Sequence, residues 1–156
     1  MRKSRIQMEI TEYFSSPKKS VYLDKIAKCE WNAAKFLESL LKENRFHEVL
    51  GGWGKLYLLV EKDELISFVT LSAEDCISAP DLTPWLGFFH TSPKYRGNRY
   101  GKILIDHACK TAKDMGYKEI YLATDHTGLY EKYGFHYFEN RIDKFGEDSR
   151  IYKKEL

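Results

Sequence analysis

The chain has 156 residues, 43% of them hydrophobic and 31% charged, an ordinary globular composition that predicts a single domain over residues 1–156. Lys and Arg (25) exceed Asp and Glu (23) by two, a near balance that argues against nucleic acid as a partner. No apolar run of about 18 residues occurs and the basic start lacks a signal-peptide core, so we expect no membrane partner.

The first half of the chain predicts one strand, one helical segment and a hairpin. Residues 6–14 alternate between polar and apolar types, which predicts a strand that Pro17 breaks. From Asp24 to Leu50 the apolar period becomes helical, and Gly51 ends that segment. Residues 55–62 and 64–72 then predict two strands joined by a tight turn.

The second half alternates strands with helices. We expect a strand at 85–91, a helix at 100–115 capped by Gly116, a strand at 118–124, a short helix at 129–133 and strands from Phe135 and Ser149. This order predicts an α/β (α+β) domain. Its mixed, mostly antiparallel sheet of about seven strands is flanked by helices, with a right-handed parallel crossover over residues 85–124. The last strands could pair between chains, which leaves a homodimer open.

The cysteines favour a reducing compartment. Cys29, Cys76 and Cys109 are too widely spaced for a metal-binding pair, so we expect no metal. Their odd number and low density suit the cytoplasm, where each would be a small buried apolar residue.

The stretch PKYRGNRYGKIL, residues 93–104, joins a predicted strand to a predicted helix. A helix N-terminus presents unpaired amides and the positive end of its dipole, so it attracts anions. Gly97 and Gly101 would let the backbone approach a bulky ligand, and Arg96, Arg99 and Lys102 add positive charge. We expect a polyphosphate to bind here.

Two common nucleotide motifs do not fit this stretch. A P-loop would need glycine in place of Arg96, and Ser or Thr in place of Ile103. The dinucleotide fingerprint needs three glycines, whereas only Gly97 and Gly101 are present.

The stretch instead resembles motif A of the GNAT superfamily of acetyl-CoA-dependent N-acetyltransferases, with Arg96 first, Gly101 last and Arg99 in place of the middle glycine. Residues 120–135, IYLATDHTGLYEKYGF, resemble motif B of the same family, although the segment before the LY pair is short and offers no Asn. The two blocks and the strand order extend over residues 55–156, and residues 1–54 match in outline only.

The resemblance implies acetyl-CoA as co-substrate. Loop amides would hold its diphosphate, and its pantetheine arm would pair with the main chain of a strand that splays from its parallel neighbour. The implied cofactor-binding residues are Phe89, His90, Thr91, Arg96, Gly97, Asn98, Arg99, Tyr100, Gly101 and Lys102.

The resemblance also implies direct transfer of the acetyl group to a primary amine in a ternary complex. A backbone N–H of the strand would polarise the thioester carbonyl. Tyr130 matches the family's tyrosine that protonates the leaving thiolate, and the competing interpretation is a core aromatic. A non-catalytic acyl-CoA-binding module with the same fold stays open.

The amine must be neutral to attack, so a base is expected. We assign Asp75, with Glu74, Asp81, His126 or a water chain as alternatives. The acceptor is open among polyamine, aminoglycoside, amino-acid-like metabolite and protein amine. Aromatic residues that could line its pocket are Trp31, Phe36, Trp53 and Trp85, with the Gly51-Gly52-Trp53-Gly54 run as a mobile loop over the site.

Overall fold

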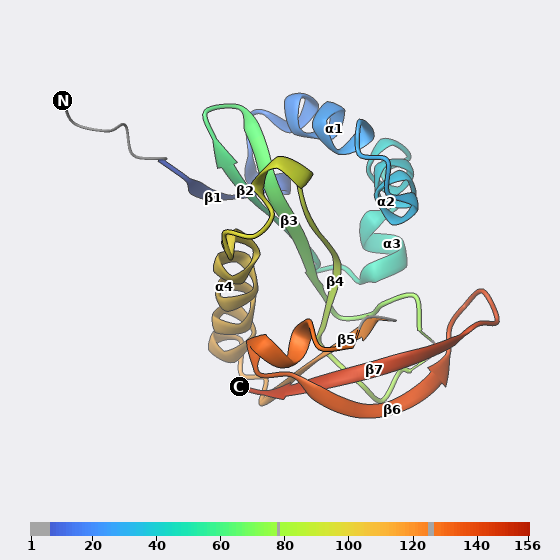
Figure 1. The fold of residues 1–156 in the computed structure, drawn as a ribbon. Coiled ribbons are helices and arrows are strands. Elements are labelled where there is room, and N and C mark those ends of the chain that lie inside the picture. Colours follow the sequence, from blue (N-terminus) through green and yellow to red (C-terminus); the bar gives the residue numbers. More distant parts are fainter. Residues whose placement is uncertain (1–6, 78, 125–126) are drawn as a thin grey trace.

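Figure 1 shows the computed structural model of the chain, which describes residues 7–77, 79–124 and 127–156. The strands are β1 (Glu9–Glu12), β2 (Lys55–Glu61), β3 (Glu64–Ser72), β4 (Trp85–Thr91), β5 (Glu119–Thr124), β6 (His136–Ile142) and β7 (Asp148–Glu155). They form one seven-stranded sheet in the order β1-β2-β3-β4-β5-β7-β6. Every neighbouring pair is antiparallel except β4 and β5, so the predicted fold class is confirmed.

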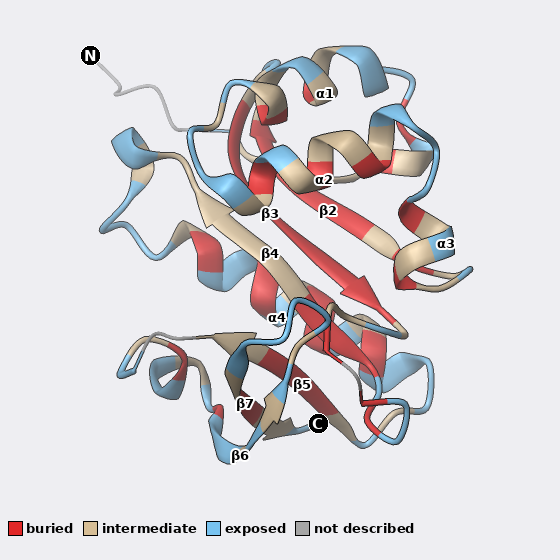
Figure 2. Cartoon of the chain, turned by 90° about the vertical axis from the view of Figure 1, so that its right-hand side faces the viewer, coloured by how far each residue is buried: buried red, intermediate tan, exposed pale blue. Residues whose placement is uncertain are grey.

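The sheet lies between two layers of helices. The helices are α1 (Lys19–Ala27), α2 (Asn32–Lys42), α3 (Phe46–Leu50) and α4 (Tyr100–Asp114). Figures 1 and 2 place α1, α2 and α3 on one face of the sheet and α4 on the other. Because helices cover both faces of the sheet, β2 and β3 are buried almost throughout.

The single helical segment expected between Asp24 and Leu50 is wrong, because the chain forms three helices there. Trp31 is extended (φ −71°, ψ 129°), which separates α1 from α2. Asn44 adopts a left-handed φ of 58°, which separates α2 from α3. None of the three helices has a side-chain N-cap, so the usual start signals are missing from the sequence.

The alternation of polar and apolar residues predicted the strands more accurately than the helical period predicted the N-terminal helices. β3 and β4 match the predicted ranges 64–72 and 85–91 at both ends. β1 is shorter than the predicted 6–14, of which residue 6 lies outside the described ranges. Its end is set by Glu12, whose carboxylate accepts the Ser15 amide at 3.1 Å and turns the chain into a short 3₁₀ helix. Within the ranges that the structure describes, no helix has the length and apolar character to cross a membrane.

Candidate active site

The parallel strands β4 and β5 separate as soon as they meet. They share one register pair, Trp85 with Tyr121, and the Tyr121 amide donates to the Pro84 carbonyl at 3.0 Å. Past Trp85, no described residue of β5 is in register with β4. The expected splay is therefore confirmed, and it leaves a strand edge with which an extended ligand could pair.

A bulge in β4 lies at the mouth of this fork. β3 pairs Phe68 with His90 and Thr70 with Gly87, so one residue of β3 faces both Phe88 and Phe89. Phe88 takes a positive φ of 50°. As a result, Phe88 packs toward the α1–α3 layer and Phe89 toward α4.

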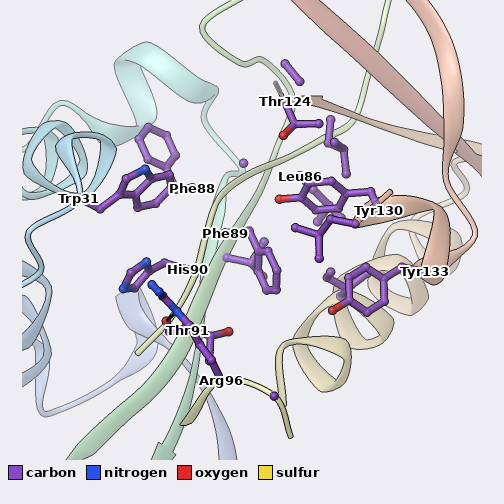
Figure 3. A pocket seen from close by; sticks show the side chains of 17 residues that line it. Trp31, Leu86, Phe88, Phe89, His90, Thr91, Arg96, Thr124, Tyr130 and Tyr133 are labelled. Atoms are coloured by element: carbon purple, nitrogen blue, oxygen red, sulfur yellow. Dashed lines mark hydrogen bonds between the residues drawn. The ribbon is translucent and has the colours of Figure 1, made fainter. Parts of the chain in front are cut away.

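The fork opens into a cavity of about 710 Å³, which is ample for a cofactor arm and a small acceptor. In Figure 3, Trp31 and Phe88 lie on one side, Tyr130 and Tyr133 on the other, and Phe89 between them. The lining comprises Trp31, Val69, Leu86, Gly87, Phe88, Phe89, His90, Thr91, Arg96, Gly97, Ile105, Leu122, Ala123, Thr124, Leu129, Tyr130 and Tyr133.

The residues assigned to cofactor binding fall into two groups. Five of them line the cavity: Phe89, His90, Thr91, Arg96 and Gly97. The other five do not line it and form the rest of the loop and the first turn of α4: Asn98, Arg99, Tyr100, Gly101 and Lys102.

Hydrogen bonds fold the loop back onto the end of β4. The Arg96 Nε donates to the Thr91 carbonyl at 3.0 Å, and the Asn98 Nδ2 donates to the Tyr95 carbonyl at 3.2 Å. Arg99 precedes α4 in a left-handed conformation (φ 59°, ψ 23°), the conformation that glycine adopts most easily. An arginine therefore stands where the backbone favours glycine. Lys102 is engaged by Asp106, with 2.6 Å between the ammonium nitrogen and the carboxylate.

Gly101 makes room for a neighbouring side chain of the protein, and not only for a ligand. A Cβ at this position would lie 2.3 Å from Cζ of Phe89, far inside contact distance. Gly97 differs, because a Cβ there would meet nothing within 4 Å and its φ is 86°. Gly97 thus faces open space beside the cavity, whereas Gly101 lets the Phe89 ring pack on α4.

Tyr130 lines the cavity from the short 3₁₀ turn Tyr130–Tyr133. Its ring meets Phe89 edge-on, with 6.1 Å between ring centroids, and meets Phe135 at 6.3 Å. Burial raises the pKa of the Tyr130 hydroxyl to about 12, with a smaller contribution from Tyr133. The phenol therefore keeps its proton across the physiological range. The position of Tyr130 agrees with the core-aromatic interpretation, and its place in the cavity lining leaves the proton-donor role as a prediction.

Asp75 lies just past β3, against the start of the bulge. One carboxylate oxygen would be 3.0 Å from a Cβ placed on Gly87, and Thr70 Oγ1 would be equally near. Burial raises the pKa of Asp75 to about 6, despite the Cys76 amide and Lys144, which both favour the ionised form. Thr70 is 1% exposed, and its hydroxyl is without a hydrogen-bond partner among the described atoms.

The other base candidates are placed differently. Asp81 is held by Arg141 through two bonds of 2.6 and 2.8 Å, which lower the pKa of its carboxyl. Glu74 is exposed and outside the cavity lining. His126 lies outside the described residues. None of these acidic residues lines the cavity, and Asp75 is the one whose carboxylate lies beside the Cβ position of Gly87.

Among the tryptophans and Phe36, only Trp31 lines the cavity. Trp53 packs on Tyr117, with 6.0 Å between ring centroids, and does not line the cavity. Trp85 is 1% exposed beside Tyr121, where its indole N–H donates to the Leu82 carbonyl. Sequence reasoning gave His90 only a main-chain role. Its ring stacks on Trp31 with 5.5 Å between centroids, and no local pattern signals this pairing.

Within residues 7–77, 79–124 and 127–156, no group of three His, Cys, Asp or Glu side chains is arranged to hold a metal ion. The cysteines are all free thiols.

Most of the chain matches one known protein family. The model of the Acetyltransferase (GNAT) family matches residues 13–135. The chain belongs to the GNAT acetyltransferase family. It is thus an acyltransferase-family protein by sequence as well as by fold. No curated protein matches it.

Solved structures give the same fold for this GNAT domain. An acetyltransferase from Streptococcus agalactiae is 27% identical, with 96% of this chain and 98% of that chain covered and a TM-score of 0.66. A GNAT acetyltransferase from Staphylococcus aureus is 20% identical, covering 96% and 99% with a TM-score of 0.67. A GNAT acetyltransferase from Elizabethkingia anophelis, solved with acetyl-CoA bound, is 18% identical, covering 96% and 98% with a TM-score of 0.65.

Proposed function

We propose that this GNAT protein transfers an acetyl group from acetyl-CoA to a primary amine by direct attack in a ternary complex. The observation that carries the proposal is the fork between β4 and β5, whose cavity runs past the Arg96 loop, the β4 bulge and Tyr130. Acetyl-CoA bound to the Elizabethkingia anophelis structure, which shares the fold, supports the choice of donor.

The diphosphate of acetyl-CoA would lie on the loop between β4 and α4. Amides from Gly97 to Gly101 precede or open a helix, where they have no intrahelical acceptor. Arg96 and Lys102 add positive charge, although Lys102 is already paired with Asp106. The pantetheine arm would then extend along β4 from Thr91 toward Phe89.

The chemistry needs three proton movements. The ammonium proton passes to the Asp75 carboxylate and on to solvent, which leaves a neutral nitrogen. That nitrogen forms a bond to the thioester carbon, and an amide N–H at the β4 bulge stabilises the oxyanion. The C–S bond then breaks as the Tyr130 hydroxyl donates its proton to the departing sulfur and takes up, directly or through water, the second proton that the nitrogen loses.

The pKa of Tyr130, raised to about 12, limits how it can act. Full transfer of its proton to a thiolate, whose conjugate acid has a pKa of about 8.5, would cost roughly 5 kcal/mol. Tyr130 therefore donates a hydrogen bond to the departing sulfur. It gives its proton to the sulfur only as it receives the proton that leaves the nitrogen, so that no free tyrosinate forms.

The pKa of Asp75, raised to about 6, suits a base that must be ionised at neutral pH. An ordinary aspartate would be a weaker base by about two pKa units. Its position against Gly87 places it beside the bulge, where the attacked carbonyl would lie.

A thiol-release assay tests the proposal. Purified protein is mixed with acetyl-CoA and a set of primary amines, and free CoA and acetylated amine are measured together. Equal amounts of both products are expected. An acyl-CoA-binding module of the same fold, the alternative, would bind acetyl-CoA and yield neither product with any amine.

Location and assembly also belong to the proposal. The free cysteines Cys29, Cys76 and Cys109 support a cytoplasmic protein. The outer strand β6 exposes Tyr137, at 46%, and Ile142, at 54%, which supports a homodimer paired along this edge. Sedimentation of the native chain beside Ile142→Lys would test the assembly, because the lysine should leave only monomer.

A further inference from the structure

One side of the cavity is built from aromatic rings that the acetyl transfer itself does not need. Trp31 and His90 stack nearly parallel, with 5.5 Å between centroids and 13° between planes. Phe88 stacks on Phe36 of α2 at 6.2 Å. Figure 3 shows Trp31, Phe88 and His90 together on the side of the cavity opposite Tyr130. Flat apolar surfaces therefore face the space left for the acceptor.

A distant turn extends this wall. Phe145, between β6 and β7, meets Phe36 edge-on at 6.3 Å and is 69% exposed. The turn is fixed by Asp143, whose carboxylate accepts the Phe145 amide at 2.8 Å, and by the Lys144 amide, which donates to the Cys76 carbonyl at 2.9 Å. A large apolar side chain is thus held in solvent at the rim of the aromatic wall, where burial by a ligand would stabilise it.

The charges in this region suit a single positive nitrogen. Among the lining residues that the structure describes there is no Asp or Glu, and Arg96 is the only one with a fixed charge. Asp75 lies outside the lining, with one carboxylate oxygen 3.0 Å from where a Cβ on Gly87 would lie. Burial lowers the pKa of His90, with a smaller contribution from Arg96, so its imidazole is neutral and does not repel an ammonium group.

Polycationic acceptors fit this arrangement poorly. A polyamine or aminoglycoside carries several ammonium groups, each of which needs a carboxylate or a carbonyl when it leaves water. Asp81, the next acidic residue along the loop, is already paired with Arg141. An ammonium group on a flat apolar body, in contrast, matches the carboxylate and the several ring faces that the described residues present here.

We infer, on the basis of the proposed function, that the acceptor is an arylalkylamine: a primary amine joined by a short chain to an aromatic ring. The ring lies among Trp31, His90 and Phe88, with Phe145 at the rim. The amine points along the cavity to the bulge, between Asp75 and the thioester.

Binding of amines to the CoA-saturated protein tests this inference apart from turnover. Calorimetric titrations use 2-phenylethylamine and tryptamine as aromatic probes, and spermidine and kanamycin as polycationic ones. We expect the aromatic amines to bind at least about tenfold more tightly than the polycations. Equal affinity, or tighter binding of spermidine or kanamycin, overturns the inference.

Substitutions of tryptophan test where the aromatic ring of the acceptor binds. Trp31→Ala should weaken 2-phenylethylamine by about tenfold and Trp31→Phe should restore most of the loss, with acetyl-CoA affinity unchanged. Trp53→Ala is the matched control, because Trp53 packs on Tyr117 away from the cavity, and it should change neither affinity. Unchanged binding in Trp31→Ala overturns the placement.

Thiol release with the same four amines separates the two proposals. Acetylation of polycations in preference to arylalkylamines would overturn the inference and leave the proposed function standing. Tight binding of arylalkylamines without any thiol release would overturn the proposed function, while the aromatic site would remain as a binding site.

Discussion

The ring of Phe89 fills the space beside Gly101 in which a side chain would otherwise lie, with Cζ 2.3 Å from the position of a Cβ. This contact joins the β4 bulge to the first turn of α4. The two parts proposed to hold the cofactor, the strand edge and the diphosphate loop, are therefore held together by this contact as well as by the Arg96 bond to the Thr91 carbonyl.

Gly101→Ala should lower the free energy of unfolding by about 1–3 kcal/mol, because the new methyl group overpacks this contact. It should also weaken acetyl-CoA binding, since the loop and β4 must shift apart. Chemical denaturation and calorimetry measure the two effects.

A second substitution, Phe89→Leu, tests whether the Phe89 ring causes the loss of stability in Gly101→Ala. In Gly101→Ala with Phe89→Leu, the Cζ atom is gone, and most of the lost stability should return. If the double variant is no more stable than Gly101→Ala alone, the contact is not the source of the effect. An alanine in an early helical turn would otherwise be favourable by up to about 1 kcal/mol.

Tyr130→Phe should reduce kcat by about 100-fold and leave the affinity for acetyl-CoA within about twofold, because the ring stays against Phe89 and only the hydroxyl is lost. Tyr133→Phe is the matched control, since Tyr133 lines the same cavity. Its kcat should stay within about threefold. Full activity in Tyr130→Phe at every pH would remove Tyr130 from the mechanism.

The kcat of the native protein should rise as pH increases through about 6, the pKa of the Asp75 carboxyl, and Asp75→Asn should abolish this rise. The loss should be smaller with trifluoroethylamine, a weakly basic amine that is mostly neutral without help. An unchanged pH profile in Asp75→Asn would assign the base to another group, and His126 or a water chain would be tested next.

The Asp75 carboxyl also makes the stability of the protein depend on pH, in a direction that its pKa determines. Its pKa rises from 3.8 to about 6 on folding, so the folded chain binds more protons between these values. The contribution of this group to stability therefore falls by up to about 3 kcal/mol as pH rises from 4 to 7. Asp75→Asn should lack that part of the decline, as urea unfolding at the two pH values would measure. A stability that rises over this range relative to the variant would contradict the placement of Asp75.

Arg96→Gln should weaken acetyl-CoA binding by about tenfold, because it removes a charge beside the diphosphate and the bond to the Thr91 carbonyl. Lys94→Gln is the control, since Lys94 pairs with Glu64 and lies outside the lining. Equal losses in the two variants would mean that only the general positive charge of the loop matters.

Local pattern was enough to predict the strands, α4 and the loop after Pro93, because alternation, helical period and glycines leave signals within a few residues. The three N-terminal helices were missed, since Lys18, Trp31 and Arg45 occupy the N-cap positions without capping. The aromatic wall was also beyond the sequence. The contacts between Trp31 and His90 and between Phe36 and Phe145 join segments far apart in the chain and exist only after folding.

A crystal structure of the protein with acetyl-CoA tests the central claim most directly. The account predicts the diphosphate on the amides of Gly97 to Gly101, the pantetheine arm along β4 and the thioester sulfur beside the Tyr130 hydroxyl. Acetyl-CoA bound elsewhere, or a fork between β4 and β5 left empty in crystals soaked at millimolar ligand, would contradict it.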